Sequence, residues 1–547
     1  MMPRVLLLTS TSAPGFHVAP PLGLHRLRHR LECSGFSCDI HDADLESEAP
    51  FLDRVARGGY AVLGFSVSHC NMADDLDRIW RFRTAAQQAK ARPLFVAGGQ
   101  EATLNYAQFL GAGIDMVLMG FAERSLVELC QGLVRQPEVP LRERAQAIPG
   151  AVVDLGGGAF AVQPARPLEA EEFRQLSYGS ALELELPYHR YWDKIRRDVD
   201  AHTFARGRFV VENVRLYTSS HCPRRCGFCS SQSFLPRSQG HELPILALSG
   251  VEVHHLILDH HRRYRIKGVL FSDDDFLIGS RSGITRALKL CELVQSSKAS
   301  GELPGDLMLS CQSRVADFLQ PGSPRSVDQR LVSAMAAAGF HSIGLGVETF
   351  SDRLLQCPTI HKHGIRSRDC RMVLDALLAA GLCPQINIIL GIPESTVKEL
   401  VDTLDTALDY ILQGCQVATT PYILTVPGSP LTHLAGYQTV TRPWIHPVTG
   451  ARVEIAERLE PSDPLIAEAM ARLQEDTDSA VRDLVERSGW GAPMLPKTAL
   501  GLARFMGLAR RLGAEPLSAR LHDTACQLLR DARQGPSPGS AQESSPM

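Results

Sequence analysis

The sequence lacks a long apolar run: no hydrophobic stretch approaches the roughly 18 residues that a membrane-spanning helix needs. It also lacks a strong excess of charge, since 57 Lys and Arg against 60 Asp and Glu give a net charge of −3. An obligatory nucleic-acid partner normally requires a basic excess, so we expect no such partner. The short apolar stretch RVLLLT near the amino terminus fits a first β-strand better than a signal peptide. We therefore expect a cytoplasmic protein without a membrane segment.

Internal repeats are absent too, which argues against a solenoid. The 14 cysteines are too thinly spread over 547 residues for a small disulfide-stabilised scaffold. We expect most of them to be buried free thiols, because they lie in apolar or helical stretches. This applies to Cys33, Cys38, Cys130, Cys291 and Cys526. The length predicts two or three domains, and 44% hydrophobic and 21% charged residues are typical of a globular protein.

One group of cysteines is tightly spaced. In the stretch HCPRRCGFC, Cys222, Cys226 and Cys229 have the spacing C-x-x-x-C-x-x-C. Three thiolates in one short loop can each bind one iron of a [4Fe–4S] cluster, and the fourth iron is then left open to a substrate. The alternatives are a zinc site, with His221 as a fourth ligand, and cysteines that are simply buried.

This spacing, with the aromatic residue Phe228 directly before the last cysteine, resembles the hallmark of the radical S-adenosylmethionine (SAM) enzymes. The resemblance implies that the methionine part of SAM binds the open iron, where its sulfonium is reduced to give a carbon radical. It also implies a partial parallel barrel. From residue 214 onwards, six strand-like segments separated by helical patterns agree with such a barrel.

Polar residues follow the expected barrel strands at the positions where this family binds SAM. By the resemblance, Ser272 and Asp273 meet the methionine amino group, and Arg314 pairs with the carboxylate. Gly346 and Glu348 belong to the glycine-rich strand beside the adenosyl part. The SAM-binding residues implied are therefore Phe228, Ser272, Asp273, Arg314, Gly346 and Glu348. The sequence identifies no catalytic residue.

Residues 1–140 alternate apolar strands and amphipathic helices, which predicts a doubly wound, Rossmann-like parallel sheet with ligands at the carboxyl ends of its strands. Directly ahead of a radical SAM barrel, this resembles the cobalamin-binding domain of the cobalamin-dependent branch of the family, with its PPLGL start, GG-x-x-x-T turn and G-x-x-E turn. The implied cobalamin contacts are Pro21, Gly23, Ser66, Ser68, His69, Gly98, Gly99, Gln100 and Gly120.

One signature of other cobalamin proteins, D-x-H-x-x-G, is missing. The stretch DIHDAD at residues 39–44 imitates part of it but lacks the glycine, so we expect no histidine ligand of that type. His69, at the end of the third strand, either faces the lower side of the corrin or is a hydrogen-bonded loop histidine.

The remaining segments predict a connection and a cap. A β-hairpin is expected around Gly156–Gly158, and Tyr188, Tyr191 and Trp192 either pack on the barrel or cover the active site. The expected fold class is α/β, with a Rossmann-like sheet, a partial (β/α)6 barrel and a carboxy-terminal helical cap. The predicted boundaries are 1–140 for the sheet, 141–213 for the connection, 214–430 for the barrel, 431–533 for the helical domain and 534–547 for a disordered tail.

These resemblances imply a cobalamin-dependent radical SAM enzyme, most simply a C-methyltransferase acting on an unactivated carbon of a small molecule or natural-product precursor. Polar methyl transfer needs an electron pair at the accepting atom, so such a carbon requires a radical. A radical cyclase, ring contraction or rearrangement enzyme is the alternative, and a non-catalytic cobalamin or iron–sulfur sensor is a third. The expected cofactors are a [4Fe–4S] cluster, SAM and cobalamin. The expected partners are a small-molecule substrate and an electron donor such as flavodoxin or ferredoxin.

Overall fold

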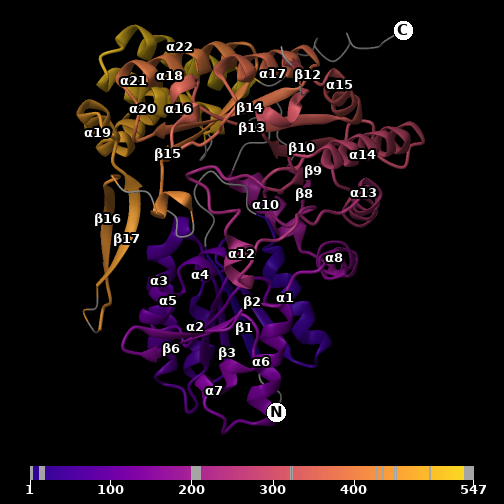
Figure 1. Ribbon diagram of the computed structural model, residues 1–547, viewed down its shortest axis with the longest axis vertical. Helices are drawn as coiled ribbons and strands as arrows, with labels where there is room; N and C mark the ends of the chain where they lie inside the picture. Colours follow the sequence, from indigo (N-terminus) through magenta and orange to yellow (C-terminus); the bar gives the residue numbers. More distant parts are fainter. Residues whose placement is uncertain are drawn as a thin grey trace.

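The structure, a computed structural model, describes residues 4–10, 19–198, 211–320, 322, 325–425, 429–433, 436–448, 450, 452–491 and 495–534. Two α/β units stack along the longest axis of the molecule, and the carboxy-terminal helices lie at the end remote from the first unit (Figure 1). Among the described helices, none has both the length and the apolarity required to cross a bilayer. Apart from Gln534, the predicted disordered tail lies outside the described residues.

The first unit is built on a mixed sheet of seven strands. They are β1 (Arg4–Thr9), β2 (Ser37–Asp42), β3 (Val62–Ser66), β4 (Leu94–Gly98), β5 (Met116–Leu118), β6 (Ala151–Gly156) and β7 (Ala159–Val162). Their order is β2-β1-β3-β4-β5-β6-β7, and the first five are parallel. In β1, Val5 and Leu7 join one core cluster, whereas Leu6 and Leu8 join the other. This alternation is expected of a strand that is covered on both faces.

Helices cover both faces of this sheet. On one side pack α1 (Leu22–Cys33), α6 (Glu123–Arg135) and α7 (Leu141–Gln146), and on the other α2 (Ala49–Ala56), α3 (Met72–Ala86), α4 (Gln100–Leu104) and α5 (Tyr106–Gly111). The doubly wound prediction is thus confirmed. The predicted burial of Cys33 is wrong: the residue ends α1 on its solvent side and is exposed, 3.7 Å from His29 Nε2.

The predicted hairpin forms as β6 and β7, and it extends the first sheet in antiparallel fashion. The connection then continues through α8 (Ala170–Arg174), the π-helical turn η2 (Gln175–Gly179), α9 (Ser180–Glu183) and α10 (Tyr188–Asp198). Tyr188 and Trp192 of α10 are buried in the barrel core, and Trp192 Nε1 donates a hydrogen bond to the Asn213 carbonyl at 3.0 Å. The buried Tyr191 hydroxyl donates to Asp42 of the first sheet. Packing, rather than covering the active site, is therefore the role of these aromatic residues.

The second unit is an open barrel of six parallel strands, as predicted. The strands are β8 (Asn213–Leu216), β9 (Gly268–Phe271), β10 (Met308–Ser313), β13 (Phe340–Glu348), β14 (Cys383–Gly391) and β15 (Gln416–Tyr422), paired in this order. The helices between them are α12 (Phe234–Gln239), α13 (Gly250–Tyr264), α14 (Arg281–Ala299), α15 (Gln329–Ala338), α16 (Asp352–Gln356), α17 (Ser367–Ala379) and α18 (Val397–Leu412), and the short β11 (Leu319–Gln320) and β12 (Ser326–Val327) pair separately. Capping boxes begin α13 at Ser249 and α18 at Thr396, which explains where both helices start.

The carboxy-terminal part contains the predicted helices, α19 (Pro464–Ala471), α20 (Leu473–Ser488), α21 (Lys497–Arg511) and α22 (Glu515–Gln534). It also contains a hairpin that was not predicted, β16 (Thr439–Ile445) and β17 (Arg452–Leu459). This hairpin runs beside the first unit, next to α3 and α5 (Figure 1). Its Trp444 and Ile455 are buried in a core cluster of that unit.

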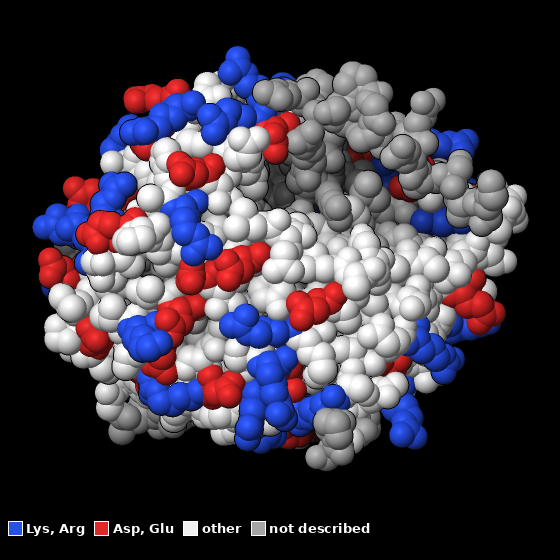
Figure 2. Space-filling view, turned by 90° about the horizontal axis from the view of Figure 1, so that it is seen from above, with Lys and Arg blue, Asp and Glu red and all other residues white. Residues whose placement is uncertain are grey.

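The face of the molecule shown in Figure 2 carries charge of both signs in close mixture. On the face shown in Figure 2, Lys and Arg alternate with Asp and Glu, and neither sign forms a continuous field there. This agrees with the small net charge of −3.

Candidate active site

The loop after β8 carries the three motif cysteines. Its turn is tight, since the Cys229 N–H donates to the Cys226 carbonyl at 3.1 Å. Gly227 between them packs directly on the backbone: a Cβ at this position would come closer than 3.0 Å to the carbonyl oxygens of Pro358 and Thr359. The short loop and its packing therefore fix the backbone that carries the three thiols.

The thiols suit a cluster better than a single ion. In the part of the chain that the structure describes, no group of three or more His, Cys, Asp or Glu could hold one metal ion. A [4Fe–4S] cluster needs no such convergence, because each thiolate binds a different iron. Burial raises the pKa of the Cys222 thiol to about 12 and raises that of Cys226 and Cys229 as well, whereas a bound metal favours the deprotonated thiolate. His221 Nδ1 lies 2.9 Å from the Ser220 hydroxyl, and no zinc site forms around it in the described residues.

The carboxylates after β9 differ in the groups that they contact. Asp273 is buried, and its carboxylate accepts hydrogen bonds from the Thr218 N–H at 2.6 Å and the Ser219 N–H at 2.7 Å. It therefore holds the start of the cysteine loop, and its predicted contact with SAM stays a prediction. Ser272, whose N–H donates to the Leu216 carbonyl, is half-buried, and its predicted role is untested too.

Asp274 was not predicted as a site residue, yet it interacts with two of the cysteines. The residue as a whole is exposed, and burial of its carboxyl nevertheless raises the pKa of this group. Its charge raises the pKa of the Cys222 and Cys229 thiols, and Ser231 hydrogen-bonds both Cys229 and Asp274. Only the fold shows which of these adjacent carboxylates faces the loop.

Arg314, directly after β10, has two hydrogen-bond donors without a partner among the described residues. Its Nε and Nη1 are buried and receive no hydrogen-bond partner from the described residues. Its positive charge also acts on Cys226. Burial raises the pKa of that thiol, and the charges of Lys362 and Arg314 oppose this rise. A buried guanidinium with free donors beside the cysteine loop fits the carboxylate of SAM.

The end of β13 carries a buried ion pair. Glu348 Oε1 lies 2.7 Å from Lys362 Nζ, and Lys362 also donates to the Gly346 carbonyl. A Cβ on Gly346 would lie 2.7 Å from both charged atoms, so a side chain at this position would displace the ion pair. Glu348 has φ 66°, a left-handed conformation that costs a non-glycine residue about 1–3 kcal/mol and is concentrated at functional sites. Phe228 packs against the barrel core nearby.

On the first unit, the end of β3 presents a histidine with one free ring nitrogen. His69 Nδ1 lies 3.2 Å from the buried carboxylate of Glu101, whereas Nε2 is buried and has no partner among the described residues. Metal-binding histidines show this arrangement, in which a carboxylate orients the ring. Asp75 ties the adjacent loops together, because it accepts from the Ser68 N–H at 2.9 Å and from the Ser10 hydroxyl at 2.5 Å.

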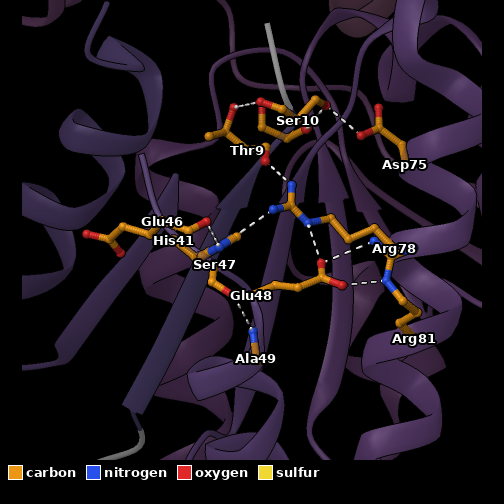
Figure 3. A network of polar contacts seen from close by, with 11 residues as sticks. Thr9, Ser10, His41, Glu46, Ser47, Glu48, Ala49, Asp75, Arg78 and Arg81 are labelled. Atoms are coloured by element: carbon orange, nitrogen blue, oxygen red, sulfur yellow. Dashed lines mark hydrogen bonds and ion pairs between the residues drawn. The ribbon is translucent and has the colours of Figure 1, made fainter. Parts of the chain in front are cut away.

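A polar network below these loops involves the histidine of DIHDAD (Figure 3). The buried Arg78 of α3 lies 2.8 Å from His41 Nδ1 and donates to the Thr9 carbonyl. His41 Nε2 lies 3.1 Å from the Glu46 carbonyl, so both ring nitrogens have partners. This agrees with the expectation that the stretch supplies no cobalt ligand.

The glycine turns serve different purposes. Gly99 has φ 102°, and a Cβ there would lie 3.3 Å from the Val67 carbonyl, so the turn requires glycine. Gly120 packs against Ser238 of α12, and its N–H donates to Thr103. Gly98, which ends β4, and Gly23 have open space at the Cβ position, apart from one ordinary contact of Gly98 with Leu118.

Two further features lie near the carboxyl ends of the strands of the first sheet. Pro21 accepts from the Leu24 N–H at the start of α1, and the carbonyl of Ser66 accepts from Ser10. A cavity of about 170 Å³ lies between the ends of β1 and β2 and the start of the barrel, lined by residues that include Pro21, Asp42 and Arg215. It is too small for a whole cofactor and could admit only part of one.

The two candidate sites touch. Gln100 Nε2, in the GGQEAT turn, donates to the Ser230 hydroxyl at 3.4 Å, and Ser230 directly follows the last motif cysteine. The predicted SAM and cobalamin residues therefore lie on facing edges of two sheets. Of the predicted cobalamin contacts, Gly120 is turned to α12, whereas Gln100 reaches the cysteine loop.

Comparison with known proteins supports both parts of the prediction, the cobalamin-binding domain and the radical SAM barrel. Residues 15–130 match the B12 binding domain family, and residues 216–407 match the Radical SAM superfamily. "Uncharacterized methyltransferase PH0819" of Pyrococcus horikoshii is 27% identical over 209 residues, which are 38% of this chain and only 39% of that protein.

Two solved structures share the fold over nearly the whole chain. The cobalamin-dependent S-adenosylmethionine radical enzyme OxsB, with aqua-cobalamin bound, has a TM-score of 0.63 at 14% identity and covers 97% of this chain and 81% of its own. The radical S-adenosylmethionine methyltransferase TsrM from Kitasatospora setae, with cobalamin and a [4Fe–4S] cluster bound, has a TM-score of 0.62 at 14% identity. The match covers 96% of this chain and 100% of the TsrM chain.

An open barrel with a three-cysteine loop, facing a doubly wound sheet, defines a radical SAM protein with an added α/β domain. The chain joins a B12 binding domain to a radical SAM domain, which is the combination predicted from the sequence. The cofactors expected from the sequence, a [4Fe–4S] cluster, SAM and cobalamin, are those of the two matched families and of the solved relatives. The prediction of family and cofactors is thus confirmed.

Proposed function

We propose that the protein is a C-methyltransferase of the cobalamin-dependent radical SAM type, acting on an unactivated carbon of a small molecule or natural-product precursor. The hydrogen bond between Gln100 and Ser230 carries the proposal, because it joins the turn assigned to cobalamin to the loop assigned to the cluster. A substrate held between the two loops is within reach of both cofactors. The methyltransferase named among the relatives supports the same chemistry.

When bound, the three cofactors supply a reductively cleaved sulfonium and a methyl carrier. The protein's part is to hold and orient. In our proposal Cys222, Cys226 and Cys229 hold the cluster, and Arg314 binds the SAM carboxylate. The stretch from Ser272 to Asp274 meets the amino group, with Asp274 as the carboxylate that is not engaged by Thr218 and Ser219 at the start of the loop.

In the first unit, the proposal assigns cobalamin to the turns after β3 and β4. His69 offers a free ring nitrogen, and the Gly98–Gln100 turn allows close approach to a large flat ligand. Reduction of the cluster requires an electron donor such as flavodoxin or ferredoxin. An air-sensitive cluster of this kind fits a cytoplasmic location.

Anaerobic reconstitution with iron, sulfide and hydroxocobalamin tests the proposal, followed by measurement of all three in the same sample. We expect a cluster and cobalamin in amounts equimolar with the chain. Cys226→Ala should lose the cluster and all SAM cleavage, whereas Cys33→Ala, which changes an exposed cysteine outside the loop, should change neither. Intact SAM cleavage in Cys226→Ala would refute the cluster assignment.

Product analysis then distinguishes the candidate reactions. Label transferred from methyl-labelled SAM to a product establishes methylation. Formation of 5′-deoxyadenosine without label transfer would indicate a cyclase or rearrangement enzyme instead. Absence of both 5′-deoxyadenosine and S-adenosylhomocysteine, with both cofactors intact, would indicate a non-catalytic sensor.

A further inference from the structure

Four charged side chains are packed between the cysteine loop and the ends of β9 and β10. They are Arg224, Asp275, Arg314 and Asp317. The proposed function uses only Arg314, so the presence of the other three needs an explanation. Buried charges are costly unless they are paired, and their pairing here connects two parts of the site.

Asp317 is the centre of this group, with a side chain only 2% exposed. Its Oδ1 lies 3.6 Å from Arg224 Nη2, and its Oδ2 accepts from the Arg314 N–H at 3.3 Å. Arg224 belongs to the cysteine loop, whereas Arg314 directly follows β10. One carboxylate thus holds the cysteine loop and the end of a barrel strand in a single arrangement.

The other contact of Arg224 makes this arrangement rigid. Its Nη2 donates to the Gly279 carbonyl at 2.8 Å. Gly279 has φ 54°, and a Cβ there would clash with the guanidinium, so the loop after β9 is shaped around Arg224. The cysteine loop is therefore clamped from two sides, by Gly279 and by Asp317.

Asp275 is the second carboxyl of the group. Its Oδ1 accepts from the Ser313 hydroxyl at 3.3 Å, and its Oδ2 is buried. Burial raises the pKa of Asp275, and the adjoining Asp317 carboxyl raises it further. Its Oδ2 has no hydrogen-bond partner in the described part of the chain, so Asp275 lies buried beside Asp317 without holding either arginine by a hydrogen bond.

These contacts involve the backbone of Arg314 and not its free side-chain donors. The Asp317 carboxylate faces Arg224 and accepts from the Arg314 backbone N–H. The Nε and Nη1 of the Arg314 guanidinium have no partner in the described part of the chain. An uncompensated buried cation is unfavourable until an anion binds to it.

We propose that Asp317 is a positioning residue for SAM, which fixes Arg224 and the end of β10 and thereby leaves the Arg314 guanidinium to the SAM carboxylate. The inference rests on the proposed function, because it takes the anion at this site to be SAM. It predicts that the two aspartates differ in their importance, although both are buried side by side.

Two isosteric variants test this difference in the reconstituted, cluster-containing protein. Asp317→Asn removes the carboxylate that faces Arg224 and the end of β10, so we expect SAM to bind about tenfold to a hundredfold more weakly, the range for a lost charge-assisted contact. Asp275 holds neither arginine by a hydrogen bond, so the SAM affinity of Asp275→Asn should stay close to that of the wild type. Asp306→Asn, at the exposed start of the same strand segment, is the control.

The readouts are equilibrium dialysis with labelled SAM and the electron paramagnetic resonance spectrum of the reduced cluster with and without SAM. In Asp317→Asn the SAM-induced change of the spectrum should need more SAM and then reach the wild-type form. Equal SAM affinity of Asp317→Asn and wild type, or equal losses in both aspartate variants, would overturn the inference. A wild-type protein that holds a cluster but binds no SAM would instead refute the proposed function.

Discussion

A glycine between two of the motif cysteines is required by its neighbours. Gly227 lies on the backbone of Pro358 and Thr359, and its own carbonyl accepts from the Leu431 N–H. A side chain at this position must push the cysteine loop away from the barrel. The geometry of the thiols thus depends on a residue that binds no iron.

We therefore predict that Gly227→Ala strongly lowers the iron and sulfide content after reconstitution, because the added Cβ displaces the loop between Cys226 and Cys229. The measurement is iron and sulfide per chain, together with far-ultraviolet circular dichroism to verify the fold. Gly305→Ala is the matched control, since a Cβ there meets nothing within 4 Å. A full cluster in Gly227→Ala would show that the loop tolerates the displacement.

Residues of the site differ in how far the sequence could predict them. The three cysteines were found by spacing, because a cluster needs several thiols in one short loop. Lys362 escaped prediction, since its partner Glu348 lies 14 residues earlier and only the loop after α16 brings the two together. Asp317 escaped for the same reason, because its partner Arg224 is contributed by a distant loop.

At the scale of elements, the strands and helices of both sheets were predictable because their apolar residues follow clear periods. The hairpin of β16 and β17 was missed, although its β-branched residues and the HPVTG turn are strand and turn signals. A purely helical carboxy-terminal region was predicted instead. What no periodicity could reveal is the position of this hairpin against the first unit, since that depends on tertiary contacts.

We predict that Trp444→Ala loosens the hairpin from the first unit. Trp444 is buried, and its Nε1 donates to Asp77 Oδ1 of α3 at 2.7 Å, so truncation removes both apolar packing and a hydrogen bond. The loss of stability should be about 3 kcal/mol, as for a buried tryptophan. Urea unfolding and limited proteolysis of the hairpin measure it.

Val448→Ala is the control, because this residue lies near the hairpin tip and is 70% exposed. It should leave both measurements unchanged. If Trp444→Ala unfolds at the same urea concentration as the wild type, the contact contributes nothing to holding the two units together.

At the scale of the whole molecule, each unit contains a buried histidine that the site does not use. His25 lies in α1 of the first unit and His260 in α13 of the barrel, and both are buried. Burial lowers the pKa of each to about 4, from an ordinary value of 6.5. His260 Nδ1 lies 2.8 Å from the Leu256 carbonyl, so the neutral ring has a partner.

These shifts predict that acid weakens the fold. Between pH 6.5 and about 4 the unfolded chain binds protons at these histidines and the native protein does not, so stability falls as the pH falls. Each histidine contributes about 3 kcal/mol over the full range, at about 1.4 kcal/mol per pKa unit. Asp75, whose pKa burial raises to about 6, acts in the opposite direction, so the effect of one histidine must be isolated by a variant.

His260→Asn isolates it, because the amide can still donate to the Leu256 carbonyl but does not titrate. We expect the urea midpoint of this variant to fall less between neutral pH and about pH 5 than that of the wild type, since the proton uptake on unfolding is lost. His189→Asn, at an exposed position, should follow the wild type at both pH values. An identical pH response of His260→Asn and wild type would mean that His260 titrates in the native protein as it does in the unfolded chain, and acid sensitivity would then have to arise from the other buried groups.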